Sequence, residues 1–199
     1  MIEKTSAEKK EIKVEELKML SEKKGCPVQR GLYYVTEFLA GPMCGRCFPC
    51  SMGSYEARIR LEKIVNGEGS EEDVRTLKRI AANMLESSFC KKGKDTAEFI
   101  VDWMASDVFD KHIEGSCPSM ECLALVEYRV IPERCDACGL CTEACKYHAI
   151  LGQKRKPYQS GYPSFEIRQK KCVKCDKCRG VCPTEAIVVG ATFKESVGV

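Results

Sequence analysis

A duplicated cysteine pattern constrains this 199-residue chain more than any other feature. Residues 135–145 read CDACGLCTEAC and residues 172–183 read CVKCDKCRGVCP, so C-x2-C-x2-C-x3-C occurs twice, 37 residues apart. A zinc ribbon uses pairs of cysteines, whereas a run of four with this spacing wraps an iron–sulfur cubane, its fourth cysteine usually binding the neighbouring cluster. The pattern predicts two crossed 4Fe–4S sites, with zinc in both loops as the alternative. The expected ligand sets are Cys135, Cys138, Cys141 and Cys182 for one cluster, and Cys172, Cys175, Cys178 and Cys145 for the other.

The composition limits the class of protein. Fifteen cysteines cannot all pair, and the start MIEKTSAEKKEIK has no apolar core that would direct the chain to an oxidising compartment. We therefore expect a cytoplasmic protein that uses its cysteines for metals. The formal net charge of +3 is too small to predict binding to nucleic acid or to a membrane surface. No apolar run approaches the ~20 residues of a membrane span.

The second half of the chain resembles the bacterial two-cluster ferredoxins over roughly residues 126–190. In that family each motif consists of a short strand, a cysteine loop, a helical turn and a second strand. The resemblance implies entering strands at 128–131 and 165–167, and a returning strand at 187–189. Many basic residues surround this half, and they either offset the negative clusters or form a docking surface for an acidic partner. They are Lys146, Lys154, Arg155, Lys156, Lys170, Lys171, Lys174, Lys177 and Arg179.

The region before it carries a third cysteine motif and reads as helical. Residues 41–50, GPMCGRCFPC, supply three cysteines, and the next cysteine comes forty residues later. Ser70 and Asp73 predict a helix start, and a further helix is expected from about 96 to 109. Apolar residues at helical spacing are expected to form the core of a small bundle. They are Ala57, Leu61, Ile64, Val65, Val74, Leu77, Ala81, Met84, Phe99, Ile100, Trp103 and Met104.

The segments LYYVTEFLA, CGRCFPC and GEGSEEDVRTL, with FC at their end, resemble one iron–sulfur module. It is the C-terminal iron–sulfur domain of the flavin- and NADH-binding subunit of respiratory complex I and of NAD-linked or electron-bifurcating hydrogenases. In the hydrogenases a two-cluster ferredoxin domain follows it, so the resemblance covers roughly residues 26–190. It implies that a third 4Fe–4S cluster is bound by Cys44, Cys47, Cys50 and Cys90.

The resemblance predicts an α+β fold, with a small helical bundle carrying one cluster before a two-cluster ferredoxin-type domain with short antiparallel strands. We expect a charged N-terminal helix or tail over 1–25, the helical 4Fe–4S domain over 26–125 and the ferredoxin-type domain over 126–199. The charged start could be a solvated tail or a helix that orders on a partner.

Three cysteines remain once twelve are assigned to clusters. Together with His112 they make a set of three thiolates and one imidazole, which is a standard tetrahedral zinc set. The alternative is that they are ordinary thiols. We predict one structural zinc ion where the helical region meets the ferredoxin-type half, bound by Cys26, His112, Cys117 and Cys122.

The resemblance implies an electron relay. The chain is expected to be the iron–sulfur electron-transfer subunit of a hetero-oligomeric, cytosolic, flavin-containing NAD(P)H-linked oxidoreductase, a class that includes electron-bifurcating complexes. It would connect a flavin- and NAD(P)H-binding subunit with ferredoxin or a catalytic redox subunit. No glycine-rich phosphate loop follows a predicted strand and no catalytic residue is predicted, so flavin and NAD are expected on the partner. The alternatives are a free-standing polyferredoxin carrier and a zinc-rich interaction module without redox function.

Overall fold

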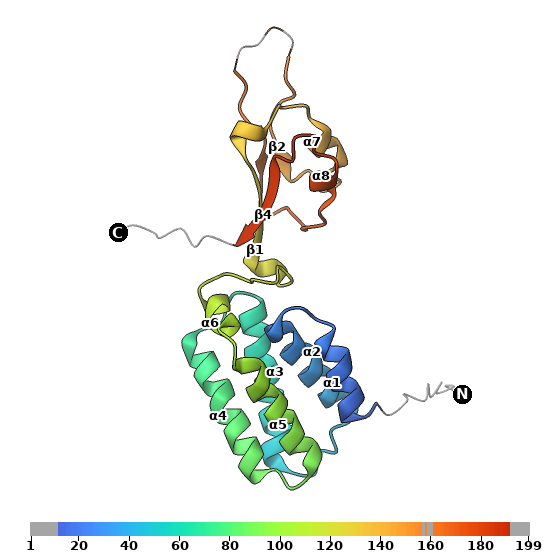
Figure 1. The fold of residues 1–199 in the computed structure, drawn as a ribbon, viewed down its shortest axis with the longest axis vertical. Coiled ribbons are helices and arrows are strands. Elements are labelled where there is room, and N and C mark those ends of the chain that lie inside the picture. Colours follow the sequence, from blue (N-terminus) through green and yellow to red (C-terminus); the bar gives the residue numbers. More distant parts are fainter. Residues whose placement is uncertain (1–11, 157, 159–160, 192–199) are drawn as a thin grey trace, which may run out of the picture. The chain divides into compact units, whose positions relative to one another are not determined.

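The computed structural model describes residues 12–156, 158 and 161–191 of the chain. The chain divides into two compact units, unit 1 (Met1–Ala124) and unit 2 (Leu125–Val199). Unit 1 is helical, and unit 2 combines short antiparallel strands with cysteine loops and helical turns (Figure 1). The predicted α+β class is confirmed. None of the helices in the described part of the chain has the length and apolar character needed to cross a membrane.

Unit 1 is a bundle whose helices pack through apolar stripes. Its helices are α1 (Val14–Glu22), α2 (Pro27–Ala40), α3 (Phe48–Val65), α4 (Glu71–Ser87), α5 (Lys91–Met104) and α6 (Val108–Ile113). All the predicted core residues are buried except Val65 and Phe99, which are half-buried. Helix α2 adds Tyr34 and Phe38, both fully buried, and each such side chain contributes roughly 1.5–3 kcal/mol to folding.

The helix predicted over 96–109 is two helices. Helix α5 begins earlier, at Lys91, and ends at Met104, while Phe109 lies in α6. The break falls where Ser106 donates a hydrogen bond from its hydroxyl to the Trp103 carbonyl (3.3 Å) and Asp107 precedes α6 as its N-cap residue. Serine and aspartate compete with helical hydrogen bonding in this way, so they favour helix ends over helix interiors.

Helix α1 is part of the bundle. It buries Val14 and Leu17 and contacts α2 and α5, and the Lys18 ammonium lies 4.0 Å from the centre of the Phe99 ring. The idea of a solvated tail, or of a helix that orders only on a partner, is therefore wrong for α1. The remainder of that predicted segment, residues 1–11, lies outside the described residues.

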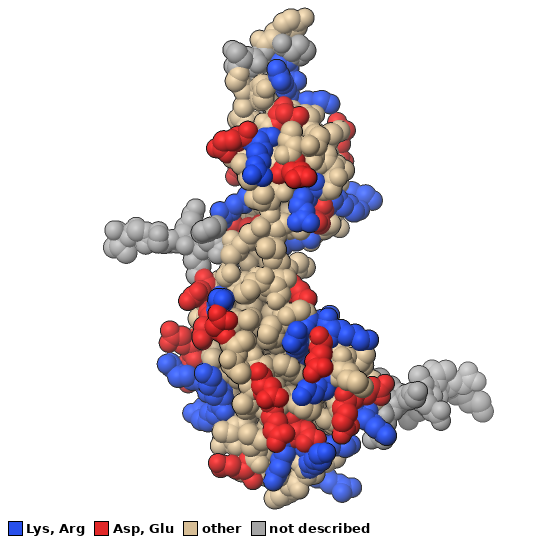
Figure 2. All heavy atoms as spheres, viewed as in Figure 1, with Lys and Arg blue, Asp and Glu red and all other residues tan. Residues whose placement is uncertain are grey.

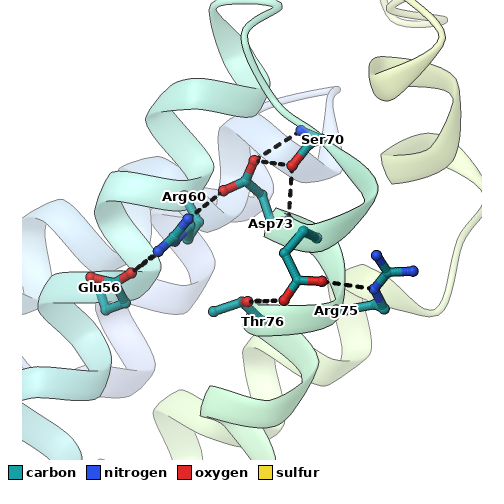
Figure 3. A network of polar contacts seen from close by, with 7 residues as sticks. Glu56, Arg60, Ser70, Asp73, Arg75 and Thr76 are labelled. Atoms are coloured by element: carbon teal, nitrogen blue, oxygen red, sulfur yellow. Dashed lines mark hydrogen bonds and ion pairs between the residues drawn. The ribbon is translucent and has the colours of Figure 1, made fainter.

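A polar network joins α3 to α4 (Figure 3). Ser70 caps α4 in a capping box: the Asp73 backbone N–H donates to the Ser70 hydroxyl (3.3 Å), and the Ser70 N–H donates to the Asp73 carboxylate (2.9 Å). That carboxylate also accepts a 2.7 Å hydrogen bond from Arg60 on α3, and Arg60 pairs with Glu56 as well. The predicted helix start at Ser70 is confirmed, and Asp73 additionally links two helices.

Unit 2 contains two antiparallel strand pairs. Strand β1 (Val126–Val130) pairs with β4 (Ile187–Ala191), and β2 (Ile150–Leu151) pairs with β3 (Glu166–Ile167). Each pair joins the strand that enters one cysteine motif to the strand that leaves the other. The short elements between them are η2 (Pro132–Arg134), α7 (Leu140–Ala144) and α8 (Lys177–Gly180), with η1 (Leu123–Leu125) leading into β1. This interlocked pairing brings the start of each motif to the end of the other.

Candidate metal centres

The two cysteine loops of unit 2 repeat in backbone conformation as well as in sequence. Five non-glycine residues and one glycine have positive φ, and they form three pairs spaced 37 residues apart. The pairs are Ala137 and Lys174, Gly139 and Asp176, and His148 and Glu185. A non-glycine residue in the left-handed region is uncommon and costs energy, so it persists where the surrounding structure imposes it. In each loop with this repeated conformation, the first three cysteines line one pocket.

Each loop encloses a pocket whose four cysteines come from both motifs. One pocket is lined by Cys135, Cys138, Cys141 and Cys182, with Val130, Phe165 and Ile187 as apolar neighbours. The other is lined by Cys145, Cys172, Cys175 and Cys178, with Tyr128, Ile150 and Ile167. The crossed grouping predicted from the spacing is the grouping that the structure brings together.

Backbone N–H groups point at the fourth cysteine of each motif. The Ala149 N–H donates to the Cys145 sulfur at 3.4 Å, and the Ala186 N–H donates to the Cys182 sulfur at 3.3 Å. Burial alone would raise the pKa of Cys182, but hydrogen bonds from the Thr184 hydroxyl and from backbone N–H groups hold it below its usual value. Such donors favour a thiolate, which is the form that binds iron.

The third set comes from two helix starts in unit 1. Cys47 and Cys90 are the N-cap residues of α3 and α5, Cys50 lies in the first turn of α3, and Cys44 lies in the loop before it. The Lys92 ammonium donates to the Pro42 carbonyl (3.2 Å), which ties α5 to that loop. Burial raises the pKa of the Cys50 thiol to about 11, and the charges of the other three cysteines of the set add to this effect. The four sulfur atoms therefore share one neighbourhood.

Two buried hydroxyls beside this third set find no oxygen or nitrogen partner among the described residues, although that of Ser54 lies near the Cys50 thiol and partly offsets the rise in its pKa that burial causes. They belong to Ser54 and Ser88, whose side chains are almost fully buried. A β-carbon added at Gly93 would lie 2.8 Å from the Ser88 hydroxyl and 3.3 Å from the Cys50 β-carbon, so these groups pack tightly together. A buried hydroxyl without a partner is costly, and the sulfur atoms of a bound cluster would supply acceptors.

The ligand atoms of these three cysteine sets lie too far apart for a site that holds a single metal ion. Among the described residues, a single group of three or more potential ligands has all its ligand atoms within 4.8 Å of one another, and it contains none of the twelve cysteines discussed so far. A lone tetrahedral ion needs sulfur atoms only ~3.8 Å apart, because Zn–S bonds are about 2.3 Å long. The wider spacing fits a larger inorganic group such as a cubane.

That one compact group is the predicted zinc set. Its members are Cys26, His112, Cys117 and Cys122, all of them buried. The Cys26 and Cys122 sulfur atoms are 3.7 Å apart, which is far beyond a disulfide bond and close to the spacing around a tetrahedral ion. The His112 Nε2 atom lies 3.2 Å from the Cys122 sulfur and 3.4 Å from that of Cys26. The donors thus face one another with the geometry of a closed zinc site.

Neighbouring groups hold these donors in place. The His112 Nδ1 atom lies 2.7 Å from the Val108 carbonyl oxygen, so Nδ1 carries the proton and Nε2 is left free for a metal. The Glu121 carboxylate accepts hydrogen bonds from the backbone N–H groups of Gly25 (2.7 Å) and Cys26 (2.9 Å). Glu121 therefore ties the segment before α2 to the chain beside Cys122.

The two nearest thiols of this set differ in protonation. A hydrogen bond from Cys122 lowers the pKa of Cys26 to about 4, against the opposing effect of burial and with help from His112. The same hydrogen bond, together with burial, raises the pKa of Cys122. Zinc binds cysteine as the thiolate, so binding here would displace the remaining thiol protons.

Comparison with known protein families identifies both regions. Residues 30–114 match the family described as the NADH-ubiquinone oxidoreductase-F iron-sulfur binding region. Residues 134–186 match the 4Fe-4S dicluster domain. The resemblance predicted from the sequence is confirmed: an iron–sulfur region of this type is followed by a dicluster domain. Both regions are of 4Fe–4S-binding types.

The curated relatives are much longer than this chain. It is 29% identical over 136 residues to the NADP-reducing hydrogenase subunit HndC of Solidesulfovibrio fructosivorans. It is 33% identical over 94 residues to an NADH-quinone oxidoreductase subunit of Mycobacterium tuberculosis, and 33% identical over 89 residues to the NADP(+)-dependent formate dehydrogenase subunit beta of Moorella thermoacetica. The matches cover 67%, 46% and 45% of this chain but 28%, 21% and 12% of those proteins. The chain thus corresponds to less than a third of each.

Sequence reasoning missed the residues that support the centres. Ser54, Ser88 and Glu121 belong to no recognisable motif; Ser54 lies one turn after Cys50 on α3, whereas Glu121 bonds backbone groups about 95 residues away. The left-handed positions could have been found from the repeat, since Gly139 is aligned with Asp176 and marks a turn of positive φ. His148 is exposed and lies just before β2.

Proposed function

We propose that this chain is an electron-relay subunit of a cytosolic, flavin-containing NAD(P)H-linked oxidoreductase complex. Three 4Fe–4S clusters, when bound, would accept and pass single electrons. The observation that carries the proposal is the convergence of twelve cysteines into three four-membered sets, two of them crossed between duplicated loops. The relatives named as NADH-, NADP- and formate-linked subunits support the nature of the complex.

The residues of this chain would ligate, space and tune the centres. The cysteine loops fix where each cluster lies, and apolar side chains such as Phe165 and Ile167 keep water away from the two centres of unit 2. Backbone N–H groups and hydroxyls that face sulfur atoms favour the reduced, more negative state of a cluster. We assign no substrate-binding or catalytic residue to this chain, so flavin and NAD(P)H are assigned to a partner subunit.

We also propose that zinc occupies the set of Cys26, His112, Cys117 and Cys122. Zinc has no redox chemistry and this site has four protein ligands, so its role would be structural. It would cross-link the start of α2, helix α6 and the segment that ends two residues before the unit boundary at Ala124.

Anaerobic purification of the native protein tests the relay proposal. We expect a flavoprotein to co-purify in fixed stoichiometry, and NADH or NADPH to reduce iron–sulfur centres of this chain within that complex. The electron paramagnetic resonance (EPR) signals should appear on addition of the nucleotide without any other reductant. Full iron content with no associated flavoprotein would favour the free polyferredoxin carrier instead. A colourless zinc-only protein would contradict both.

A further inference from the structure

The two cysteine loops of unit 2 hold equivalent ligand sets but differ in charge. Windows 133–148 and 170–185 correspond position for position. The first contains two basic and three acidic residues, and the second contains five basic and two acidic residues, giving net charges of −1 and +3. We name the basic residues of the second window the basic collar. They are Lys170, Lys171, Lys174, Lys177 and Arg179.

Within the two aligned windows, the positive charge is concentrated in the second loop. At the positions equivalent to the collar, the first loop has one basic residue among five. Those positions are Glu133, Arg134, Ala137, Leu140 and Thr142. Beside the first loop, Lys154 packs against Gly139 and pairs with Glu143 (3.7 Å), so a basic residue there is already engaged within the chain.

The collar is available to a partner. Lys170, Lys171 and Lys177 are exposed, and they form no ion pair with any residue that the structure describes. Arg179 is exposed and pairs with Asp176 at 3.0 Å. Figure 2 shows Lys and Arg side chains projecting around the part of unit 2 that contains α8. Because the three lysines have no acidic partner among the described residues, they attract anions, and dissolved salt weakens that attraction.

Two collar residues, Lys174 and Lys177, line the same pocket as an exposed apolar patch beside one centre. Val173 and Tyr147 are 46% and 53% exposed, and both line the pocket that contains Cys175. Cys175 itself is exposed, whereas its counterpart Cys138 is half-buried. An apolar centre with a charged rim is the usual composition of a protein–protein interface. Here the patch lies beside the exposed ligand Cys175, where this centre is open to the surface.

We propose that the basic collar docks an acidic electron-carrier protein, and that the centre held by Cys145, Cys172, Cys175 and Cys178 is the one that exchanges electrons with it. The inference rests on the proposed relay function and adds the exit point and the charge of the partner. One electron passes between the two proteins, so that one centre is oxidised as the other is reduced, and no bond or proton is transferred. Complementary charge speeds such an encounter and makes it depend on salt.

Binding between oxidised proteins tests the proposal without any turnover. The probe is a small, strongly acidic two-cluster ferredoxin, titrated anaerobically into the full chain in a calorimeter. The test variant is Lys171→Glu/Lys177→Glu. The matched control is Lys154→Glu/Lys156→Glu, which makes the same charge change in unit 2 beside the first loop, where Lys154 packs against Gly139. We expect the test variant to weaken binding at least about tenfold at low salt, and the control less than about threefold. Added salt should weaken wild-type binding and abolish the difference between the variants.

Three outcomes would overturn the docking surface. They are equal losses in the two variants, binding of the acidic ferredoxin that does not depend on salt, and equally tight, collar-dependent binding of a DNA duplex, which would indicate a general polyanion surface. Iron content and EPR spectra of the wild type and both variants distinguish a failure of the docking proposal from a failure of the relay proposal. Three intact centres together with a collar that does not affect binding refute the docking proposal alone. Absence of the centres from the wild type refutes the relay itself.

Discussion

The two units bring four cysteines together in different ways. In unit 2 the ligands come from short loops whose spacing is visible in the sequence, and the paired strands β1–β4 and β2–β3 interlock the loops. In unit 1 three ligands lie within seven residues. The fourth, Cys90, lies at the start of α5, and it reaches the other three because the two long helices between them, α3 and α4, pack together. The cluster sites of unit 2 thus depend on local loop geometry, and that of unit 1 depends on the stability of a helical bundle.

The largest expected effect is the loss of a whole cluster through a crossed ligand. Cys182→Ala should abolish the centre of Cys135, Cys138 and Cys141, because its sulfur lines that pocket. Iron should fall by about four atoms from about twelve, and the lost EPR signal should be the one removed by Cys138→Ala.

Two reference variants make this outcome decisive. If Cys182→Ala instead lost the signal that Cys175→Ala removes, the crossed assignment would be refuted. Cys90→Ala is the counterpart in unit 1, and it should remove a third signal while leaving both signals of unit 2. Collapse of all signals in Cys90→Ala would contradict the independence of the two units.

Release of zinc should have the next largest effect. Cys117→Ser removes one of four ligands, and we expect it to release about one zinc per chain and to lower the melting temperature of unit 1. Iron content and the unit 2 signals should stay unchanged. Elemental analysis measures the zinc and differential scanning calorimetry measures the melting temperature, with Ser119→Ala, an exposed position two residues away, as the control. Full iron with no zinc in the wild type would refute the site.

The network between α3 and α4 gives a smaller effect that is confined to unit 1. Asp73→Ala removes the carboxylate half of the capping box of α4 and leaves Arg60 without its buried partner, so it should destabilise unit 1 by about 1–3 kcal/mol. Urea unfolding followed by tryptophan fluorescence measures this, because the single Trp103 lies in unit 1. The control, Glu71→Ala, removes an exposed ion pair with Arg75 and should cost less than about 1 kcal/mol.

The contribution of Asp73 should also depend on pH. Burial alone would raise the pKa of this carboxyl, but Arg60 and Ser70 hold it below its usual value of 3.8. Its stabilisation is therefore complete above pH 3.8 and is lost as the pH falls through the lowered native pKa. The stability difference between the wild type and Asp73→Ala should shrink in acid; a difference that grows there would contradict the sign of the shift.

The smallest predicted effect is on a reduction potential. If the Ser54 hydroxyl donates to a sulfur of the unit 1 centre, Ser54→Ala should lower that potential by roughly 20–60 mV, since one hydrogen bond contributes about 0.5–1.5 kcal/mol and 59 mV is about 1.4 kcal/mol for one electron. Ser51→Ala is the control, because the Ser51 hydroxyl already bonds the Cys47 carbonyl. Equal shifts in both variants, or none in Ser54→Ala, would contradict the role of Ser54.

The sequence was most informative where metal binding fixes the spacing of the cysteines. The crossed sets follow from the spacing of Cys135 to Cys145 and of Cys172 to Cys182, and the strands that flank them are implied by the resemblance to two-cluster ferredoxins. The bundle core was predictable because helical periodicity marks Leu61, Leu77 and Ile100. The break between α5 and α6 was missed, because the apolar period continues to Phe109 while Ser106 and Asp107 interrupt the backbone hydrogen bonding.

Long-range contacts could not be predicted. The hydrogen bonds from Gly25 and Cys26 to Glu121 join positions that are far apart in the chain, and no local pattern marks them. The first 25 residues are predicted to be a charged helix or tail; the packing of α1 was not predicted, because only Val14, Leu17 and Ser21 are buried, too few to give a clear apolar stripe. Both depend on tertiary packing, which a single sequence encodes only weakly.

The central claim is that fifteen cysteines and one histidine are divided among four centres of two kinds. Anomalous X-ray diffraction from anaerobically grown crystals, collected on both sides of the iron and zinc absorption edges, tests it most directly. We predict iron peaks at three sites, bonded respectively by Cys44, Cys47, Cys50 and Cys90, by Cys135, Cys138, Cys141 and Cys182, and by Cys145, Cys172, Cys175 and Cys178. A separate zinc peak should lie between Cys26, His112, Cys117 and Cys122. Single zinc ions at the cysteine loops, or Cys182 bonded to the same cluster as Cys172, would contradict the account.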